Sequence, residues 1–228
     1  MVTNVPVITI DGPSGVGKGT LCKELSKELK WNILDSGAIY RVLAFLAIRD
    51  QININSKDSL IQLVSHLVNL HFIFENNKMK IILKKTDISM DIRNQKISDV
   101  ASRIALLPCL RKAILNFQRS FRLLPGLIAE GRDMGTIIFP DALVKIFLDA
   151  NTKTRTKRRM LQLQKNGVNV NFDQLLLQIQ ERDKRDYHRV VSPLIIADDV
   201  FIINSTHMSK QKVMEAALHY TYLKLTRA

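Results

Sequence analysis

Short apolar runs alternate with longer amphipathic segments along most of the chain. The first run, Val5 to Ile10, is rich in β-branched residues and ends at Asp11 and Gly12, which is typical of a buried strand. Four later runs are also short and bounded by polar or glycine-bearing turns, namely 33–34, 127–129, 144–148 and 200–203. Strands that alternate with helices predict an α/β fold, in which a five-stranded parallel sheet is flanked by helices.

Several segments between these runs predict the helices that cover the sheet. A helix is expected over 18–29, directly after the first strand. Apolar residues recur three and four positions apart in the other segments, which places them on one helix face. These segments are 107–121, 172–188 and 210–225.

Between about 60 and 100 the pattern changes. The runs His71–Glu75 and Lys78–Leu83 flank Asn76 and Asn77, residues that favour a tight turn between two strands. We therefore predict a β-hairpin within a small inserted subdomain. The length of 228 residues suits one domain over 1–228 that contains this insertion.

Cysteine usage and apolar run lengths indicate the compartment. Cys22 and Cys109 form no disulfide framework, which favours a reducing environment. No run reaches the roughly 18 to 20 apolar residues of a membrane span, and Met1 to Ile10 lacks the basic start of a signal peptide. We expect a cytoplasmic protein without a membrane partner, and a monomer.

The chain carries 34 Lys and Arg residues against 21 Asp and Glu residues, a formal net charge of +13. Such an excess attracts nucleic acids, anionic lipids or small phosphorylated substrates. Composition leaves these three classes open, so local motifs must decide among them.

A glycine-rich segment joins the first strand to the first helix, with Lys18 at the helix start. Glycines let the backbone approach a polyanion, while N–H groups, the helix N-terminus and the lysine supply positive charge. We predict that this loop binds the phosphates of ATP and that Lys18 acts in catalysis. The loop comprises Gly12, Pro13, Ser14, Gly15, Val16, Gly17, Lys18, Gly19 and Thr20.

Gly19 departs from the general phosphate-loop motif, which has Ser or Thr directly after the lysine. Here Thr20 comes one place later, an order that resembles the loop of nucleoside monophosphate kinases. Because a glycine stands at the usual hydroxyl position, we expect Mg²⁺ to be held partly through water. We predict no dedicated set of metal-binding residues.

Arginines follow several predicted strands, among them Arg41 and Arg132, and a later helix carries Arg182, Arg185 and Arg189. A nucleoside monophosphate is mostly a dianion at pH 7, so its phosphorylation requires relief of repulsion between two anions. The planar fork of arginine suits that task. Segments after parallel strands converge at one edge of a sheet, so these arginines can meet. A solvated surface charge is the commoner alternative for each of them, but not for Arg132.

Arg155, Lys157, Arg158 and Arg159 open the segment after the run 144–149. Two interpretations stay open: a solvated basic face or nucleic-acid patch, and a mobile lid over about 153–168 that closes on the phosphoryl group and excludes water. In the second interpretation Arg158 and Arg159 act in catalysis with Lys18 and Arg132.

Several motifs taken together resemble those of bacterial cytidylate kinases. The resemblance extends from residue 5 to the C-terminus, and its clearest motifs are Ile8–Gly15, Leu34–Arg41, Gly131–Thr136 and Phe147–Ala150. It implies the P-loop nucleoside monophosphate kinase fold, with an inserted CMP-binding subdomain and a lid. It also implies ATP as phosphoryl donor and CMP or dCMP as acceptor, with no nucleic-acid partner.

The resemblance implies a role for each matching residue of the acceptor site. Ser36, Arg41, Arg132 and Arg189 would hold the CMP phosphate, Ser102, Arg111 and Asp133 would read the cytosine, and Arg182 and Asp186 would meet the sugar. The chemistry of the base agrees, since a carboxylate suits the cytosine amino group and an arginine suits the N3 and O2 acceptors. The alternative for Asp133 is a structural aspartate that pairs with Arg132 or caps a turn.

Two other functions stay open. A kinase for UMP, AMP or shikimate uses a similar loop, but Asp133 with Ser102 and Arg111 favours cytosine. A nucleic-acid-binding ATPase would account for the charge of +13. Such a protein would hydrolyse ATP without CMP and respond to DNA or RNA in a salt-dependent way.

Overall fold

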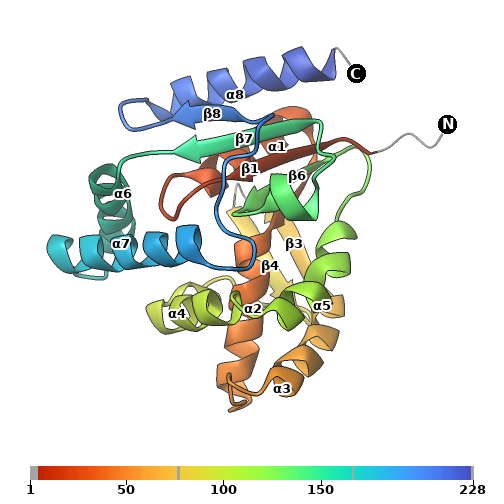
Figure 1. The fold of residues 1–228 in the computed structure, drawn as a ribbon, viewed down its shortest axis with the longest axis vertical. Coiled ribbons are helices and arrows are strands. Elements are labelled where there is room, and N and C mark those ends of the chain that lie inside the picture. Colours follow the sequence, from red (N-terminus) through yellow and green to blue (C-terminus); the bar gives the residue numbers. More distant parts are fainter. Residues whose placement is uncertain (1–4, 76–77, 166, 227–228) are drawn as a thin grey trace.

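Figure 1 shows the computed structural model, which describes residues 5–75, 78–165 and 167–226. The strands are β1 (Val7–Asp11), β2 (Asn32–Asp35), β3 (Leu70–Glu75), β4 (Lys78–Leu83), β5 (Thr86–Asp87), β6 (Leu127–Gly131), β7 (Val144–Asp149) and β8 (Phe201–Asn204). The helices are α1 (Lys18–Leu29), α2 (Ser36–Arg49), α3 (Lys57–Gln62), α4 (Gln95–Ile104), α5 (Pro108–Arg119), α6 (Thr152–Lys165), α7 (Phe172–His188) and α8 (Lys210–Leu225). Three short helical turns are η1 (Leu63–Asn69), η2 (Asp91–Arg93) and η3 (Met134–Ile138).

A five-stranded sheet forms the centre of the molecule, with the strand order β2-β6-β1-β7-β8. All neighbouring pairs are parallel, and β1 lies in the middle, paired with β6 on one side and β7 on the other. The predicted five-stranded parallel sheet is confirmed, and each strand lies within about two residues of its expected range. Because the strands are parallel, their carboxyl ends share one edge, on the left of Figure 1.

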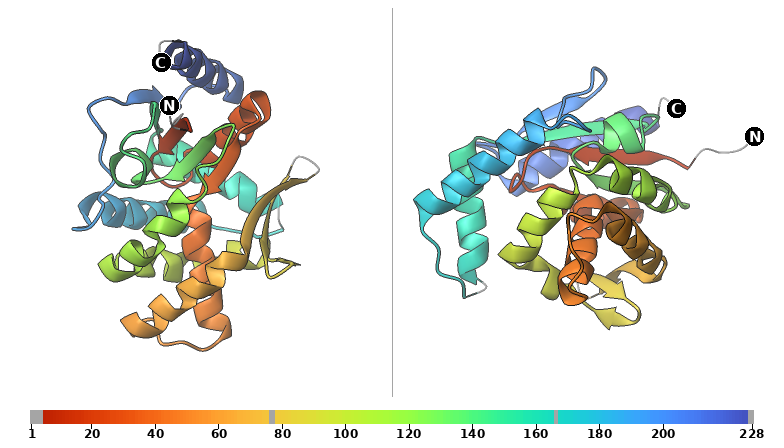
Figure 2. Two further views of the ribbon diagram at one scale, coloured as in Figure 1. Left: turned by 90° about the vertical axis from the view of Figure 1, so that its right-hand side faces the viewer. Right: turned by 60° about the horizontal axis from the view of Figure 1, so that its bottom comes forward.

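Alternate strand residues face opposite sides of the sheet, as strand geometry requires. Ile8 and Ile128 pack with residues of α1 and α8, whereas Val7 and Leu127 pack with residues of α2, α4 and α5. The sheet is therefore covered on both faces. Figure 2 shows α6 and α7 extending beyond the sheet, past the edge where the strands end.

Helix α2 is the main element that sequence periodicity did not predict. Nine of its 14 residues are buried, so apolar residues occupy most of its circumference and no single stripe stands out. Its start is fixed locally, because the Asp35 side chain accepts a hydrogen bond of 2.9 Å from the Ala38 N–H. The predicted helices over 18–29, 172–188 and 210–225 have the bounds of α1, α7 and α8, and α5 is slightly shorter than expected.

The segment between α2 and α5 contains the predicted hairpin. β3 and β4 pair antiparallel in the register Leu70↔Leu83, and the short β5 completes a three-stranded sheet. The predicted turn at Asn76 and Asn77 lies outside the described residues. Leu60, Leu67 and Ile97 belong to the same buried cluster as α2, so this segment packs directly on the central domain. Within the described ranges, no helix combines the length and the apolar character of a membrane crossing.

Asp11, the last residue of β1, holds the segment that follows β6. Its carboxylate is buried and accepts hydrogen bonds from the Met134 N–H at 2.9 Å and the Gly135 N–H at 2.8 Å. Burial raises the pKa of Asp11 to about 6, while the two N–H bonds favour the ionised form. Arg132 and Asp133 lie between β6 and these two residues, so Asp11 fixes where both side chains begin.

We predict that Asp11→Asn lowers the free energy of unfolding by about 1 to 3 kcal/mol, because the amide can accept one N–H bond but turns a donor towards the other. Urea denaturation measures this change. Asp199→Asn is the control, since Asp199 is exposed and its ion pair with Lys145 lies at the surface. Equal stability of the two variants would contradict the role of Asp11.

Candidate active site

Four loops meet at the carboxyl edge of the sheet. The glycine-rich loop follows β1, Ser36 follows β2, Arg132 follows β6, and α6 follows β7 after two residues. In parallel α/β sheets this edge is the usual place of the ligand crevice. The structure therefore brings together segments that lie more than a hundred residues apart in the chain.

The glycine-rich loop has backbone conformations that only glycine adopts without strain. Gly12 has a φ of 147°, and a Cβ atom there would lie 2.0 Å from the carbonyl oxygen of Leu148. Gly17 has a φ of 109°, and no side chain caps the N-terminus of α1 that follows it. The first N–H groups of α1 are thus available to an anion, as in other phosphate-binding loops.

Lys18 is buried inside this loop. Its Nζ atom donates to the carbonyl oxygens of Gly12 at 2.7 Å and Pro13 at 3.0 Å. Burial and the nearby Arg132 guanidinium lower the pKa of Lys18 to about 7, and the carboxylate of Glu130 opposes this shift. The charged form of Lys18 is therefore disfavoured in the free protein, and a polyanion bound nearby would favour it.

Arg132 connects the loop to α7. Its Nε atom donates to Asp186 Oδ2 at 2.7 Å, and its Nη1 atom donates to the Gly12 carbonyl at 2.8 Å. The Gly12 oxygen accordingly accepts hydrogen bonds from both Lys18 and Arg132. The structure places Asp186 as the partner of Arg132, while its predicted contact with the sugar stays a prediction.

Arg111 and Asp133, predicted to read the cytosine, form a buried ion pair. Arg111 also donates from Nε to Ser192 Oγ at 3.1 Å and from Nη1 to the Ala105 carbonyl at 3.0 Å. Among the described residues Asp133 pairs with Arg111 and not with Arg132. The two predicted base-reading groups are thus brought together. The Arg111 side chain comes from α5, and its bond to Ala105 holds the guanidinium at the end of α4.

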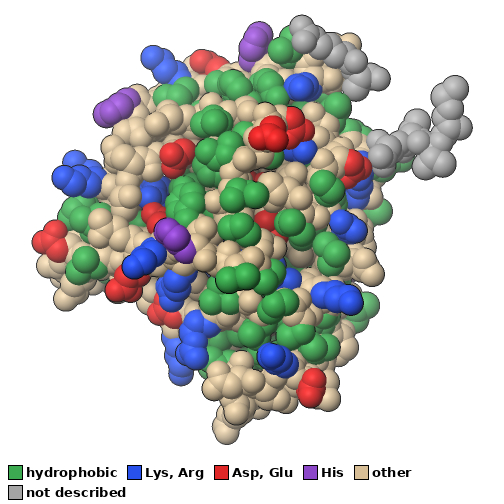
Figure 3. All heavy atoms as spheres, in the orientation of Figure 1, with side chains coloured by type: hydrophobic (Ala, Val, Ile, Leu, Met, Phe, Trp, Pro, Cys, Tyr) green, Lys and Arg blue, Asp and Glu red, His purple; other side chains and the backbone are tan. Residues whose placement is uncertain are grey.

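Several arginines at this edge have shifted pKa values. Burial and Arg132 lower the pKa of Arg182 to about 9. Burial and Arg111 likewise lower the pKa of Arg189, and burial and Arg41 lower the pKa of Arg159. Loss of solvation is the main cause of these three shifts and a neighbouring guanidinium adds to it, whereas nearby carboxylates raise the pKa of Arg132 and Arg111. A bound polyanion would favour the charged forms of Arg182, Arg189 and Arg159. Figure 3 shows Lys and Arg side chains over α7 and α4, on this side of the molecule.

Two predicted serines lie on neighbouring helices. Ser36 is buried at the start of α2, and its hydroxyl donates to Gln118 Oε1 at 2.7 Å. Ser102 is half-buried on α4, which packs against α2. Sequence analysis missed Gln118, because a glutamine on a helix carries no motif.

Arg155 corrects the interpretation of the basic cluster. It is only 4% exposed and makes five hydrogen bonds, one for each guanidinium N–H. The acceptors are the carbonyls of Ala150 and Ser14, Thr152 Oγ1 and both carboxylate oxygens of Asp183. Arg155 is therefore neither a solvated charge nor a free lid arginine, but a link between α6, α7 and the glycine-rich loop.

The next two arginines of α6 differ from Arg155. Arg158 donates to the Val16 carbonyl of the loop at 3.1 Å and to Ser205. Within the described part of the chain, Arg159 donates only to Gln162 of its own helix. Arg159 is the predicted catalytic arginine of α6 that is least tied to the domain.

Glu130 lies close to Gly19, the position of the departure from the motif. A Cβ atom at Gly19 would lie 3.1 Å from Glu130 Oε1, so any side chain there would require this carboxylate to move by a few tenths of an ångström. Burial and Asp35 raise the pKa of Glu130 to about 8, and Lys18 opposes the shift. No group of three or more His, Cys, Asp or Glu residues suits a metal among the described residues. Mg²⁺ needs only one or two carboxylates beside phosphates and water, so Glu130 and Thr20 fit that role.

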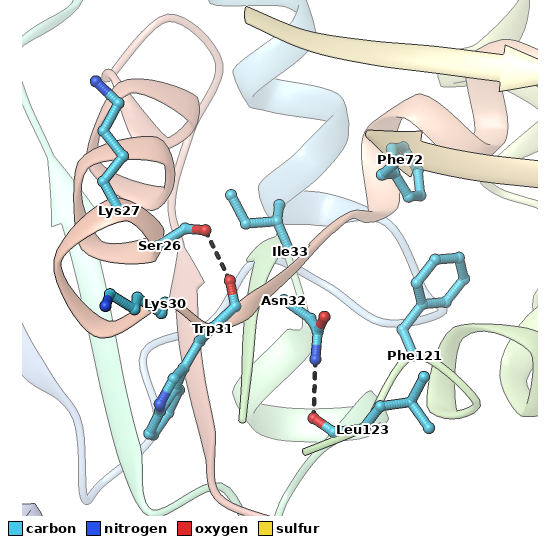
Figure 4. Close-up of a pocket in the computed structure, with 9 residues that line it drawn as sticks. All are labelled: Ser26, Lys27, Lys30, Trp31, Asn32, Ile33, Phe72, Phe121 and Leu123. Atoms are coloured by element: carbon cyan, nitrogen blue, oxygen red, sulfur yellow. Dashed lines mark hydrogen bonds between the residues drawn. The ribbon is translucent and has the colours of Figure 1, made fainter. Parts of the chain in front are cut away.

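Of two surface cavities, only the second includes predicted site residues. One, of about 560 Å³, lies at the amino end of β2 between α1 and the aromatic side chains Phe72 and Phe121 (Figure 4). The Trp31 indole points away from these two rings. The other, of about 570 Å³, lies between α1 and α8 and includes Gly19 and Thr20 from the loop.

We predict that Arg155→Lys lowers the free energy of unfolding by about 2 to 4 kcal/mol, because an ammonium group cannot replace five fixed hydrogen bonds around a buried carboxylate. Arg159→Lys, four residues along the same helix, should change it by less than about 0.5 kcal/mol. Denaturant unfolding of both variants makes the comparison. Similar stabilities would show that Arg155 is not a structural link.

Comparison with known proteins agrees with this geometry. Residues 8–222 match the family model described as cytidylate kinase. The chain is 52% identical over 228 residues to the cytidylate kinase of Salmonella typhimurium, and 53% identical to that of Escherichia fergusonii. Each alignment covers the whole of both chains. A match of this extent and identity shows that the chain belongs to the cytidylate kinase family.

Proposed function

We propose that this protein transfers the γ-phosphoryl group of ATP to CMP or dCMP, which yields ADP with CDP or dCDP. Membership of the cytidylate kinase family supports the reaction and the acceptor. The structural observation that carries it is the meeting of Lys18 and Arg132 at the Gly12 carbonyl, beside the uncapped start of α1 at the carboxyl edge of the sheet. The phosphates of two nucleotides would match these cationic groups.

The glycine-rich loop suits the donor phosphates. Its uncapped helix start offers N–H groups, and Lys18 already points at loop carbonyls that lie beside them. When ATP binds, the ammonium group can exchange these carbonyls for phosphate oxygens. A charge held in a buried site stabilises the transferring phosphoryl group more than a solvated charge would.

Arg132 suits the boundary between donor and acceptor. It lies against the loop carbonyl of Gly12 and is oriented by Asp186 on α7. A monophosphate acceptor is already a dianion, so the site needs no base to remove a proton. The task of Arg132, with Arg41 and Arg189, is to hold two anions close enough to react.

Mg²⁺, which would neutralise charge on the donor phosphates, fits beside Glu130 and Thr20. Glu130 is buried near Lys18, and Thr20 lies in the first turn of α1, at the end of the loop. Mg²⁺ would also stabilise the ionised form of Glu130, whose burial otherwise disfavours charge. We assign Glu130 as the carboxylate that orients the hydrated ion.

The lid is assigned to α6 and the loop that follows it, about residues 153–168. Arg155 ties the base of α6 to Asp183 and to the loop, and Arg158 ties the next turn to Val16 and Ser205. Closure would release the Arg158 contacts and bring Arg159 over the phosphoryl group while Arg155 stays fixed. Closure of this kind excludes water, which competes with the acceptor.

A coupled assay of ADP release across CMP, dCMP, UMP and AMP tests the function. Rapid turnover should require CMP or dCMP, and Lys18→Ala should lower kcat by about a hundredfold or more. Lys27→Ala is the matched control, because Lys27 is an exposed residue of the same helix. ADP release without an acceptor, stimulated by DNA or RNA, would instead indicate the nucleic-acid-dependent ATPase.

Base choice gives a second test. Asp133→Asn should lower the ratio of kcat/KM for CMP over UMP by about tenfold or more, because an amide turned to donate no longer accepts from the cytosine amino group and no longer repels the uracil carbonyl. The ratio separates recognition from structure, since loss of the Arg111 ion pair alone would lower both values together. An unchanged ratio in folded protein would mean that cytosine is read elsewhere.

A further inference from the structure

One buried hydroxyl group at the carboxyl edge has no hydrogen-bond partner among the described residues. It belongs to Tyr40 of α2, whose side chain is 6% exposed. Buried polar groups are nearly always paired, because desolvation without a hydrogen bond is unfavourable. Thr9 Oγ1 and Thr136 Oγ1 also have no partner among the described residues, so an unpaired hydroxyl points to a ligand only where other ligand-binding groups surround it.

The surroundings of Tyr40 place this hydroxyl in the acceptor site. The Arg111 guanidinium lies over the Tyr40 ring, with 5.7 Å between its Cζ atom and the ring centroid. Asp133 and Arg189 are the other charged groups that act on the hydroxyl. Arg111 and Asp133 are the proposed base-reading pair, and Arg189 is a proposed phosphate ligand.

Two further unpaired atoms belong to the same site. Arg182 Nε and Arg189 Nη2 are also buried without a hydrogen-bond partner in the part of the chain that the structure describes. Both residues belong to the proposed acceptor site: Arg182 lies in α7 and Arg189 directly follows it. Unsatisfied donors from α2 and from the α7 segment are thus available to the acceptor oxygens of one ligand.

The chemistry of the hydroxyl is that of a donor. Burial raises the pKa of Tyr40 to about 12, so the phenol stays protonated at neutral pH. Arg111, stacked on the ring, has no acceptor to offer the O–H group. A nucleoside monophosphate does, because its phosphate, sugar and base all carry acceptor oxygens.

We propose that Tyr40 is a further substrate-binding residue, whose hydroxyl donates a hydrogen bond to an oxygen of the bound nucleoside monophosphate. The inference rests on the proposed function, since it takes the acceptor to be CMP or dCMP. The Tyr40 ring has a separate role, because its cation–π contact supports the Arg111 guanidinium. One side chain would therefore both position a base-reading residue and donate the new hydrogen bond.

The substitution Tyr40→Phe tests this directly, because it removes the hydroxyl and keeps the ring beneath Arg111. The KM and the calorimetric Kd for CMP should rise about five- to tenfold, with KM for ATP and kcat changed by less than about twofold. Without ligand, the melting temperature should equal that of the wild type or exceed it by about 1 to 4 °C, since an unpaired buried hydroxyl is removed.

Tyr220→Phe is the matched control. Tyr220 lies on α8, where its ring stacks on Phe201 at 4.5 Å, and it should leave both nucleotide constants unchanged. An unchanged CMP constant in Tyr40→Phe would overturn the proposal, as would a melting temperature more than about 2 °C below the wild type, which would show that the hydroxyl has a partner within the fold. Neither result would contradict the proposed function. That function is tested separately by the turnover of CMP in the wild type and in Tyr220→Phe.

Discussion

The carbonyl oxygen of Gly12 accepts hydrogen bonds from both Lys18 and Arg132. Gly12 can occupy this place only because it has no side chain, since a Cβ atom would collide with the Leu148 carbonyl of β7. One backbone atom thereby sets the separation of two cations, one in the glycine-rich loop and one beside the proposed acceptor site. The rest of the arrangement depends on it: Asp186 orients Arg132 from α7, and Asp11 holds the segment on which Arg132 stands.

The arginines at this edge suit the proposed function but are unfavourable for the stability of the free protein. Arg182 and Arg189 are buried near other guanidinium groups, which disfavours their ionised forms in the free protein. Asp183 and Asp186 offset part of that repulsion through Arg155 and Arg132. Phosphates bound as proposed would favour the charged forms of Arg182 and Arg189, so ligand binding should stabilise the folded protein.

Local sequence predicted much of the fold, because apolar residues recur at regular intervals in strands and in helices with one exposed face. The apolar runs predicted β1 and β7, and the apolar stripes predicted α7 and α8, without any information on tertiary contacts. Helix α2 did not follow this rule, since burial on most sides removes the polar face that periodicity detects. The glycine-rich loop and Arg132 were predicted from spacing and position. The buried pairing of Arg155 with Asp183 and the orphan hydroxyl of Tyr40 were not, because both depend on which groups the fold removes from water.

Glu130 and Gly19 lie 111 residues apart in the chain yet share one small space, where the carboxylate approaches the first turn of α1. The residue that follows Lys18 therefore senses the acid at the end of the neighbouring strand. A side chain at position 19 fits only if the Glu130 carboxylate moves by a few tenths of an ångström. A sequence change at one of these positions is thus expected to alter what the other tolerates, although the two lie on different elements.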